Sequence, residues 1–265
     1  MKRFNYAKTT IGIFMKNQMQ DKSNIFLDFL NMISRCFIVF LLYKYIFKIN
    51  GGTMNGVDYK TTMWSMFIYF CIMTFNLRKV YNQIMVEVKS GNVEMFMNKP
   101  VSYLMYSYYK IIGSGLYSFL VISFLGTILM IVFLGVPIVN IKIFIPTLIL
   151  TFILGQILAL FMYSAIGLLS FFINDVRPIY WIVDKFVMVL GGSYLPISLF
   201  PKALKVFAYI SPFGAVNFAT STVFKSWETE YLIRFEIQIF WIIISFIVLM
   251  FIYKKAKEKA MINGG

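Results

Sequence analysis

Six long, mostly apolar stretches recur along this chain of 265 residues, and they restrict its fold more than any other feature. The stretches run from Phe26 to Phe47, Tyr59 to Leu77, Tyr103 to Val136, Ile141 to Ile173, Tyr180 to Leu195 and Tyr231 to Tyr253. About 20 apolar residues let a helix cross a bilayer, where every backbone hydrogen bond must be made within the protein. We therefore predict an all-α integral membrane protein with six transmembrane helices in one domain, residues 1–265.

Composition supports the same class. Hydrophobic residues make up 60% of the chain and charged residues only 14%, and aromatic residues alone reach 19%. A soluble domain has about 45–50% apolar and about 25% charged residues. The excess is expected to face membrane lipid. The net charge of +14 would favour nucleic-acid binding in a soluble protein, but here we assign it to cytoplasmic loops and expect no nucleic acid as partner.

The sequence offers few groups for catalysis. It has no histidine, and Cys36 and Cys71 lie inside apolar stretches without CxxC spacing. An intramembrane protease or transferase needs a nucleophile with its base, or a metal cluster. No acidic pair at metal-ligand spacing occurs within the predicted spans. We therefore expect no catalytic residue, no metal and no cofactor held by this chain.

Basic residues indicate an orientation. With the N-terminus inside, 16 of the 25 Lys and Arg residues fall on the inner side, 8 on the outer side, and Arg35 within a span. Cytoplasmic loops are enriched in Lys and Arg. We expect a multi-pass protein of the plasma membrane with both termini in the cytoplasm.

The first 24 residues read as a helix at the inner interface. Apolar side chains recur at helical spacing between residues 3 and 20, with lysines and glutamines between them. Such a helix places its apolar side in the acyl region and its lysines toward anionic headgroups. The alternative is a simple lead-in to the first span.

The inner loop 87–102 is too polar to span a membrane. Val93, Phe96 and Met97 fall at positions i, i+3 and i+4, so a short helix here would present an apolar knob on the cytoplasmic side. Pro100 would end that helix. A soluble partner could push on such a helix, whereas the alternative is an ordinary amphipathic turn.

Residues 191–224 are broken by prolines into pieces too short to cross. Backbone at membrane depth that is not helical must be buried in protein or line a water-filled cavity. We predict a re-entrant pair of short helices on the outer face. Such an element would close the outer end of a pathway, and the residues expected to form this outer gate are Pro196, Phe200, Pro201 and Pro212.

Polar residues also lie inside the spans. Asn24, Asp28, Asn31 and Arg35 share one face of the first helix, where charge is costly unless it faces protein or water. We expect Asp28, Asn31 and Arg35 to line a pathway or a contact with another membrane subunit; the alternative is snorkelling near the inner interface. Asp184 and its neighbour Lys185 are expected at headgroup depth.

These features together resemble the permeases of the type-2 ABC exporter family. Residues 89–102 (KSGNVEMFMNKPVS) resemble the coupling-helix region of a bacterial branch of that family. Residues 195–201 (LPISLFP), followed by 211–213 (SPF), resemble its signature before the last span. Members have an N-terminal interface helix, six spans, a coupling helix between the second and third spans, and a re-entrant element before the sixth.

The resemblance implies partners and residue roles. Two permeases, alike or different, would pair above two cytoplasmic ABC ATPase subunits that bind ATP and Mg. Here no glycine is followed by lysine, so a phosphate loop is lacking and the ATPase would be a separate polypeptide of a bacterium. Gly91 would give the turn into the coupling helix, Phe96 and Met97 the knob, and Glu94 and Lys99 its polar rim.

Other function classes remain open on the sequence alone. An ATP-independent secondary transporter or channel is the main alternative, although broken helices repeated in both halves would then be usual. An assembly or immunity protein that uses the same bundle without transport is another. The cargo stays undefined among drug, peptide antibiotic and lipid.

Overall fold

The computed structural model describes residues 2–93 and 102–263, which are nearly all helical. Its elements, in chain order, are α1 (Lys2–Gln20), α2 (Lys22–Ile49), β1 (Thr53–Met54), β2 (Val57–Asp58), α3 (Tyr59–Phe75), the 3₁₀ turn η1 (Leu77–Lys79), α4 (Val80–Lys89), α6 (Tyr103–Leu134), α7 (Ile141–Leu168), η2 (Leu169–Phe171), α8 (Arg177–Leu190), η3 (Ile197–Leu199), α9 (Lys202–Ile210), α10 (Pro212–Ala215), η4 (Phe218–Ser221) and α11 (Trp227–Asn263). This content confirms the predicted all-α class.

Four helices of the described chain are long and apolar enough to cross a membrane. They comprise α2, α6, α7 extended through η2 to Phe171, and α11 as far as Lys259. The second and fifth predicted spans correspond to α3 and α8, which have 17 and 14 residues. At 1.5 Å per residue these helices are about 26 and 21 Å long, short of the roughly 30 Å hydrocarbon core. The count of six spans therefore stays a prediction.

Local sequence explains where the first helices begin. The Asp58 carboxylate accepts a hydrogen bond from the Thr61 backbone N–H at 3.3 Å and caps α3, and Asp21 caps α2 in the same way. Between these helices β1 pairs with β2 in a short hairpin. Its turn residues Asn55 and Gly56 have φ values of 49° and 74°, the left-handed backbone that Asn-Gly hairpin turns require.

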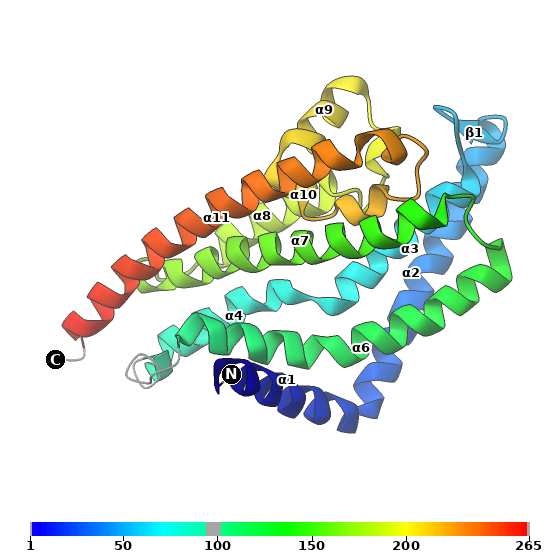
Figure 1. Cartoon of the computed structure of the whole chain (residues 1–265). Helices are drawn as coiled ribbons and strands as arrows, with labels where there is room; N and C mark the ends of the chain where they lie inside the picture. Colours follow the sequence, from blue (N-terminus) through cyan, green and yellow to red (C-terminus); the bar gives the residue numbers. More distant parts are fainter. Residues whose placement is uncertain (1, 94–101, 264–265) are drawn as a thin grey trace.

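The long helices run side by side. In Figure 1, α7 packs along α11 and α4, while α3 packs against α6, and α2 crosses the bundle at a steeper angle. The end of α4, the start of α6 and the last turns of α11 lie at one end of the molecule. The β1–β2 hairpin and the connection from α6 to α7 lie at the opposite end. We call these the coupling end and the hairpin end.

Two apolar cores hold the bundle together. The first joins α4, α7, α8 and α11 to the start of α6, and its fully buried members include Ile84, Leu158 and Tyr163. The second joins α2, α3 and the later part of α6 around Met63, Phe67 and Ile122. Many other large apolar side chains on α2, α6 and α11 are exposed, as expected for helices surrounded by lipid.

Helix α1 occupies the predicted N-terminal interface segment and packs along α6. The two helices approach closely at Gly113, where a Cβ atom would lie 2.7 Å from the Ile11 carbonyl oxygen. Farther along, the Gln18 amide donates a hydrogen bond to the Ser118 hydroxyl at 3.1 Å. These contacts fix α1 to the bundle, while its depth relative to a bilayer stays a prediction.

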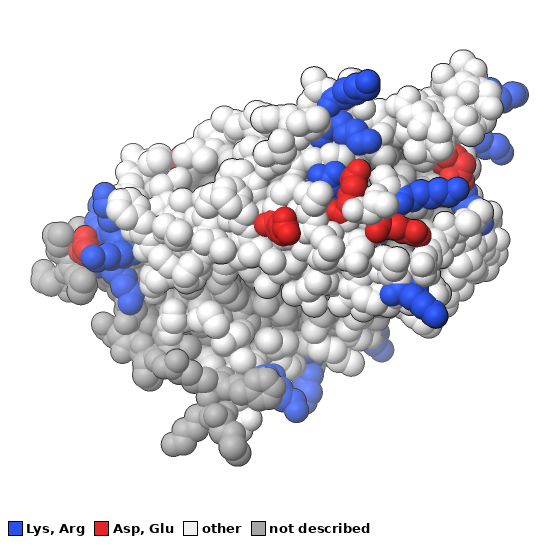
Figure 2. Space-filling model, turned by 45° about the horizontal axis from the view of Figure 1, so that its top comes forward, with Lys and Arg blue, Asp and Glu red and all other residues white. Residues whose placement is uncertain are grey.

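Charged residues are separated along the molecule. Figure 2 shows Lys and Arg at one end of the visible face and a mixed group of basic and acidic residues from its middle to the other end, with a largely uncharged surface between the two groups. An uncharged apolar band flanked by charges fits a membrane-embedded surface.

Candidate functional site

The coupling end is organised around Glu87, near the end of α4. Its carboxylate accepts hydrogen bonds from the Tyr103 hydroxyl at 2.6 Å and from the Lys110 ammonium at 3.2 Å. Both partners lie on α6, and Tyr103 is almost fully buried. Because α4 and α6 flank the predicted coupling loop, this cluster joins the two helices from which that loop emerges.

Two of the predicted coupling residues are described. Gly91 has φ +72°, a left-handed conformation that glycine adopts without strain, and its N–H donates to the Val88 carbonyl at 3.1 Å. Val93 is 1% exposed and belongs to the first core. The other predicted coupling residues, namely Glu94, Phe96, Met97, Lys99 and Pro100, lie outside the described residues.

The polar face predicted on the first span lines a cleft between α2 and α3. Asp28, Asn31 and Arg35 border a space of about 190 Å³, opposite Thr74, Asn76 and Lys79 near the end of α3. Within the described residues neither Asp28 nor Arg35 forms an ion pair with a protein side chain. The structure thus brings these three predicted residues together with a polar wall from α3.

Asn24 does not join them, although the helical spacing placed it on the same face. Its side-chain amide donates to the Asp21 carboxylate at the start of α2, and its backbone N–H is capped by the same group. Asn24 therefore serves the helix start.

A buried charged cluster lies at the centre of the molecule. Arg78 Nη1 is 2.7 Å from Asp184 Oδ1, and the Tyr163 hydroxyl donates to the same carboxylate oxygen at 2.9 Å. The side chains of Arg78 and Asp184 are only 8% and 10% exposed. Protein therefore surrounds the Asp184 carboxylate, while the expectation that this residue lies at headgroup depth stays a prediction. Lys185 does point outward, 5.6 Å from the centre of the Trp181 ring.

Sequence reasoning missed this cluster. Its three members come from η1, α7 and α8, and Arg78 and Asp184 are 106 positions apart. A usable signal was present, because Asp184 lies within the fifth predicted span and Arg78 directly follows the second. Opposite charges at these positions are costly in a membrane unless they meet a partner.

Aromatic stacking reinforces the contact of α4 with α8. The Tyr81 and Tyr180 rings stack with centroids 3.7 Å apart and an interplanar angle of 13°. Gly167 on α7 allows close approach, since a Cβ there would lie 2.9 Å from the Ile84 Cβ on α4. Consequently α4, α7 and α8 form one packed unit that includes the charged cluster.

The turn from α7 to α8 carries an exposed ion pair. Arg177 binds the Asp175 carboxylate through two nitrogens at 2.8 Å each. These hydrogen bonds lower the pKa of Asp175 to about 2, so the carboxylate stays ionised at physiological pH.

The predicted outer gate lies in a run of short helices between Gly191 and Phe224. Pro196 and Phe200 are buried, Pro212 is half-buried and Pro201 is exposed. Each proline directly precedes or begins a helical turn, with Pro196 before η3, Pro201 before α9 and Pro212 at the start of α10. This placement explains why the segment is divided, since proline suits the first helical position and interrupts a helix elsewhere.

Side chains of the long helices satisfy backbone groups of this segment. The Tyr43 hydroxyl donates to the Tyr194 carbonyl at 2.5 Å, and the Ser65 hydroxyl to the Thr220 carbonyl at 2.7 Å. Gln238 on α11 donates to the Ala215 carbonyl at 2.8 Å. Irregular backbone can lie inside a membrane protein only when its polar groups are paired in this way.

Helix α7 also packs tightly against the segment. A Cβ atom at Gly155 would collide with the Val216 carbonyl oxygen. The small residue is therefore required by a close approach of α7 to the short helices.

The described residues contain no group of three or more His, Cys, Asp or Glu side chains that could hold a metal ion. The functional features found are instead the Glu87 cluster, the polar cleft, the Arg78–Asp184 cluster and the short-helix segment 191–224.

Comparison with known proteins agrees with this architecture. The family model described as ABC-2 family transporter protein matches residues 29–264. Curated protein sequences give no match. The family match begins within α2 and continues through α11, so it includes all four features except Asp28 of the polar cleft. This chain therefore belongs to the ABC-2 family of transporter proteins, as an integral membrane component.

Proposed function

We propose that this chain is the membrane-spanning permease subunit of an ATP-driven ABC exporter. The observation that carries the proposal is the family match over residues 29–264 on a bundle of membrane-length helices. The chain itself would not be an enzyme. ATP and Mg would bind to separate cytoplasmic ABC ATPase subunits, and a second permease, identical or related, would complete the translocation path.

In this proposal the protein crosses a bacterial plasma membrane six times, with both termini in the cytoplasm. The second crossing would combine α3 with η1 and α4, which together extend from Tyr59 to Lys89. The fifth would combine α8 with the chain that follows it toward Leu199. The coupling end then faces the ATPase, in keeping with the excess of Lys and Arg predicted for that side.

The geometry supports a route for motion from the ATPase to the outer side. A push on the loop after Gly91 would move α4, whose base is joined to α6 by Glu87. Arg78, directly before α4, would pass this movement to α8 through Asp184. Helix α8 leads straight into the segment 191–224, so its displacement would move the proposed outer gate.

The polar cleft gives the same movement a second effect. Asn76 separates α3 from η1 and has a φ of 47°, so the helix is broken where it borders the cleft. A shift of η1 and α4 would therefore change the space beside Asp28, Asn31 and Arg35. We assign these residues to the pathway or to the contact with the second permease.

Cross-linking from single cysteines tests the ATPase contact. In a chain with Cys36 and Cys71 replaced by Ser, Asn92→Cys would place a thiol at the coupling end and Asn140→Cys at the hairpin end. A bifunctional thiol reagent applied to native membranes should join Asn92→Cys to a protein that mass spectrometry identifies as an ABC ATPase. Asn140→Cys should give no such product, and a further Glu94→Lys change should weaken the Asn92→Cys product.

Equal ATPase cross-linking from both positions, or none from Asn92→Cys with the chain folded and in the membrane, would contradict the proposal. The second outcome, together with activity that persists without ATP, would favour a secondary transporter or channel.

A further inference from the structure

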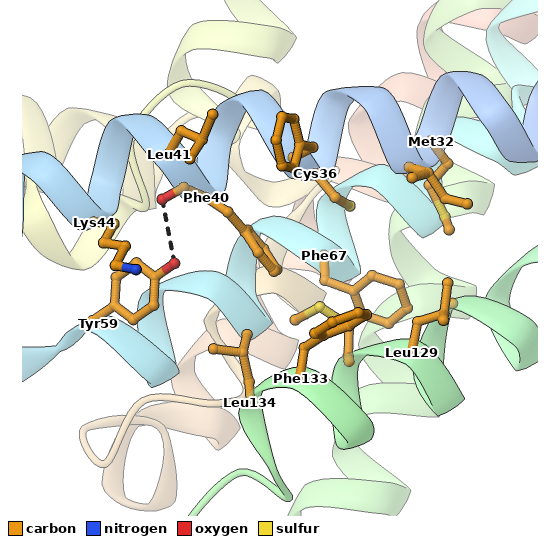
Figure 3. Close-up of a pocket in the computed structure, with 14 residues that line it drawn as sticks. Met32, Cys36, Phe40, Leu41, Lys44, Tyr59, Phe67, Leu129, Phe133 and Leu134 are labelled. Atoms are coloured by element: carbon orange, nitrogen blue, oxygen red, sulfur yellow. Dashed lines mark hydrogen bonds between the residues drawn. The ribbon is translucent and has the colours of Figure 1, made fainter.

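An apolar cavity of about 520 Å³ lies between α2, α3 and α6 (Figure 3). Pockets that bind small molecules have volumes of about 300–1,000 Å³ and are mostly apolar, with a few polar groups that orient the ligand. Figure 3 shows Met32, Cys36 and Phe40 directed from α2 toward Phe67 on α3 and Phe133 on α6. The cavity therefore has the size and the lining of a ligand site.

The cavity lies where α2 is only partly buried, between two places at which it packs closely. Met32 and Tyr43 are 5% and 2% exposed, and the 11 positions from one to the other correspond to roughly 16 Å of helix. At the inner contact the helices approach closely at Gly126. A Cβ atom at this position would lie 2.7 Å from Met32 Cε and 2.7 Å from Phe67 Cε2. At the outer contact, Tyr43 is hydrogen-bonded to the Tyr194 carbonyl. Both walls of the gap are thus held in place.

One side of the cavity is open. Phe37 and Leu41 on α2 are 61% and 55% exposed, and Phe133 on α6 is 76% exposed. All three lie in helices of membrane-crossing length and composition. A hydrocarbon chain in the bilayer could therefore enter between α2 and α6 without passing through water.

The outer end of the cavity is polar and positive. Lys44 lines it beside Tyr59, whose hydroxyl donates to the Phe40 carbonyl at 3.3 Å (Figure 3). In the part of the chain that the structure describes, Lys44 forms no ion pair. A cation without a protein partner at the mouth of an apolar cavity is complementary to an acidic headgroup joined to an alkyl chain.

The inner end meets the polar cleft. Met32 lines both spaces, so one flexible side chain separates the apolar cavity from Asp28, Asn31 and Arg35. Methionine is unbranched and adapts its conformation readily. The two spaces together would accommodate a molecule that is apolar along its length and polar at its end.

We propose that the cavity binds an anionic single-chain amphiphile, with the alkyl chain between Met32 and Phe133 and the acidic group at Lys44. In so far as this ligand is cargo, the inference rests on the proposed export function and names its substrate class. Binding itself requires no ATPase, so it can be tested separately.

The probe is a long-chain fatty acid that carries a diazirine, with its methyl ester as the uncharged analogue. The full chain in nanodiscs is irradiated with the probe, and the labelled residues are mapped by mass spectrometry. Label should concentrate on residues 32–44 and 126–134. Leu129→Trp should fill the cavity and abolish most of the labelling. Val132→Trp, on the lipid-facing side of the same helix, should leave labelling unchanged.

The headgroup is tested with Lys44→Gln, and Lys48→Gln, which does not line the cavity, serves as the control. Lys44→Gln should weaken labelling by the acid about three- to fivefold, the effect of one partly exposed ion pair, and leave the ester unaffected. Wild-type label found mainly on α8 or α11, or equal labelling of Leu129→Trp and Val132→Trp, would overturn the site. Equal loss of acid and ester would overturn the role of Lys44.

A resident bilayer lipid and a free amphiphile share this chemistry, and the nanodisc composition distinguishes them. If phosphatidylglycerol nanodiscs suppress labelling relative to phosphatidylcholine, a two-chain bilayer lipid occupies the cavity, and the assignment of a single-chain ligand is overturned. If labelling is retained in both, the site takes a free amphiphile. The labelling result holds whether or not an ATPase is later found, so failure of the site and failure of the exporter proposal are separate outcomes.

Discussion

Removing one charge from the Arg78–Asp184 pair should destabilise the protein strongly, and removing both should not. Asp184→Asn keeps the shape of the side chain but leaves the Arg78 guanidinium, 8% exposed, without a counter-charge. Breaking a buried pair in this way costs about 3–5 kcal/mol. Replacing both residues, as in Arg78→Met with Asp184→Leu, is often neutral or stabilising because neither charge then has to be desolvated. Both this double variant and its reference carry Tyr163→Phe, so that no buried hydroxyl loses its acceptor.

The assay is thermal unfolding of the purified chain in detergent. Unfolding is measured as the loss of the monodisperse fraction on size-exclusion chromatography after heating. For a chain of this size about 1 kcal/mol corresponds to about 2–4 °C, so Asp184→Asn should lower Tm by about 6–20 °C. The double variant should unfold near the temperature of its Tyr163→Phe reference. Asp175→Asn is the matched control, because it removes the same charge from the exposed pair with Arg177 and should change Tm little.

A Tm for Asp184→Asn within about 2 °C of wild type would refute the buried-pair reasoning. The double variant also tests the proposed route of motion. If the pair links α4 to α8, the double variant should fold and bind its ATPase, yet lose ATP-driven activity. Retained activity would show that movement passes by another contact.

Three further substitutions test the packing and the coupling end. Gly113→Ala should loosen α1 from α6, because its Cβ would lie 2.7 Å from the Ile11 carbonyl oxygen, and α1 should then be proteolysed faster. Gly12→Ala is the control, because a Cβ there has no neighbour within 4 Å and α1 should stay protected. Gly155→Ala should lower Tm by several degrees, because α7 would have to move away from the short-helix segment. Glu87→Gln should change Tm little, because the Lys110 partner is partly exposed. The same change should reduce stimulation of the ATPase, and unchanged stimulation would count against the role of the Glu87 cluster.

The helical architecture was largely predictable, because lipid imposes one rule on every crossing segment. A run such as 103–136 has to be helical, since its backbone finds no water in the bilayer, and α6 occupies nearly this range. The β1–β2 hairpin was not predicted. Asn55-Gly56 carries its signal, but strands of two residues each are too short to show an alternating pattern.

The functional features were predictable only where they are local. The shared face of Asp28, Asn31 and Arg35 follows from helical spacing, and the structure shows these residues on one cleft. Arg78 and Asp184 meet only through the packing of η1, α7 and α8, which spacing does not encode. The apolar cavity likewise depends on how α2 packs against α3 and α6. In the sequence its lining residues cannot be distinguished from ordinary lipid-facing side chains.

The most direct test of the central claim is to purify the tagged chain from its native membrane and identify what remains bound by mass spectrometry. The account predicts recovery of an ABC ATPase together with a second permease, and the identity of that permease would distinguish a homodimer from a heterodimer. Recovery of this chain alone, in a form that still moves substrate across vesicles without ATP, would contradict it.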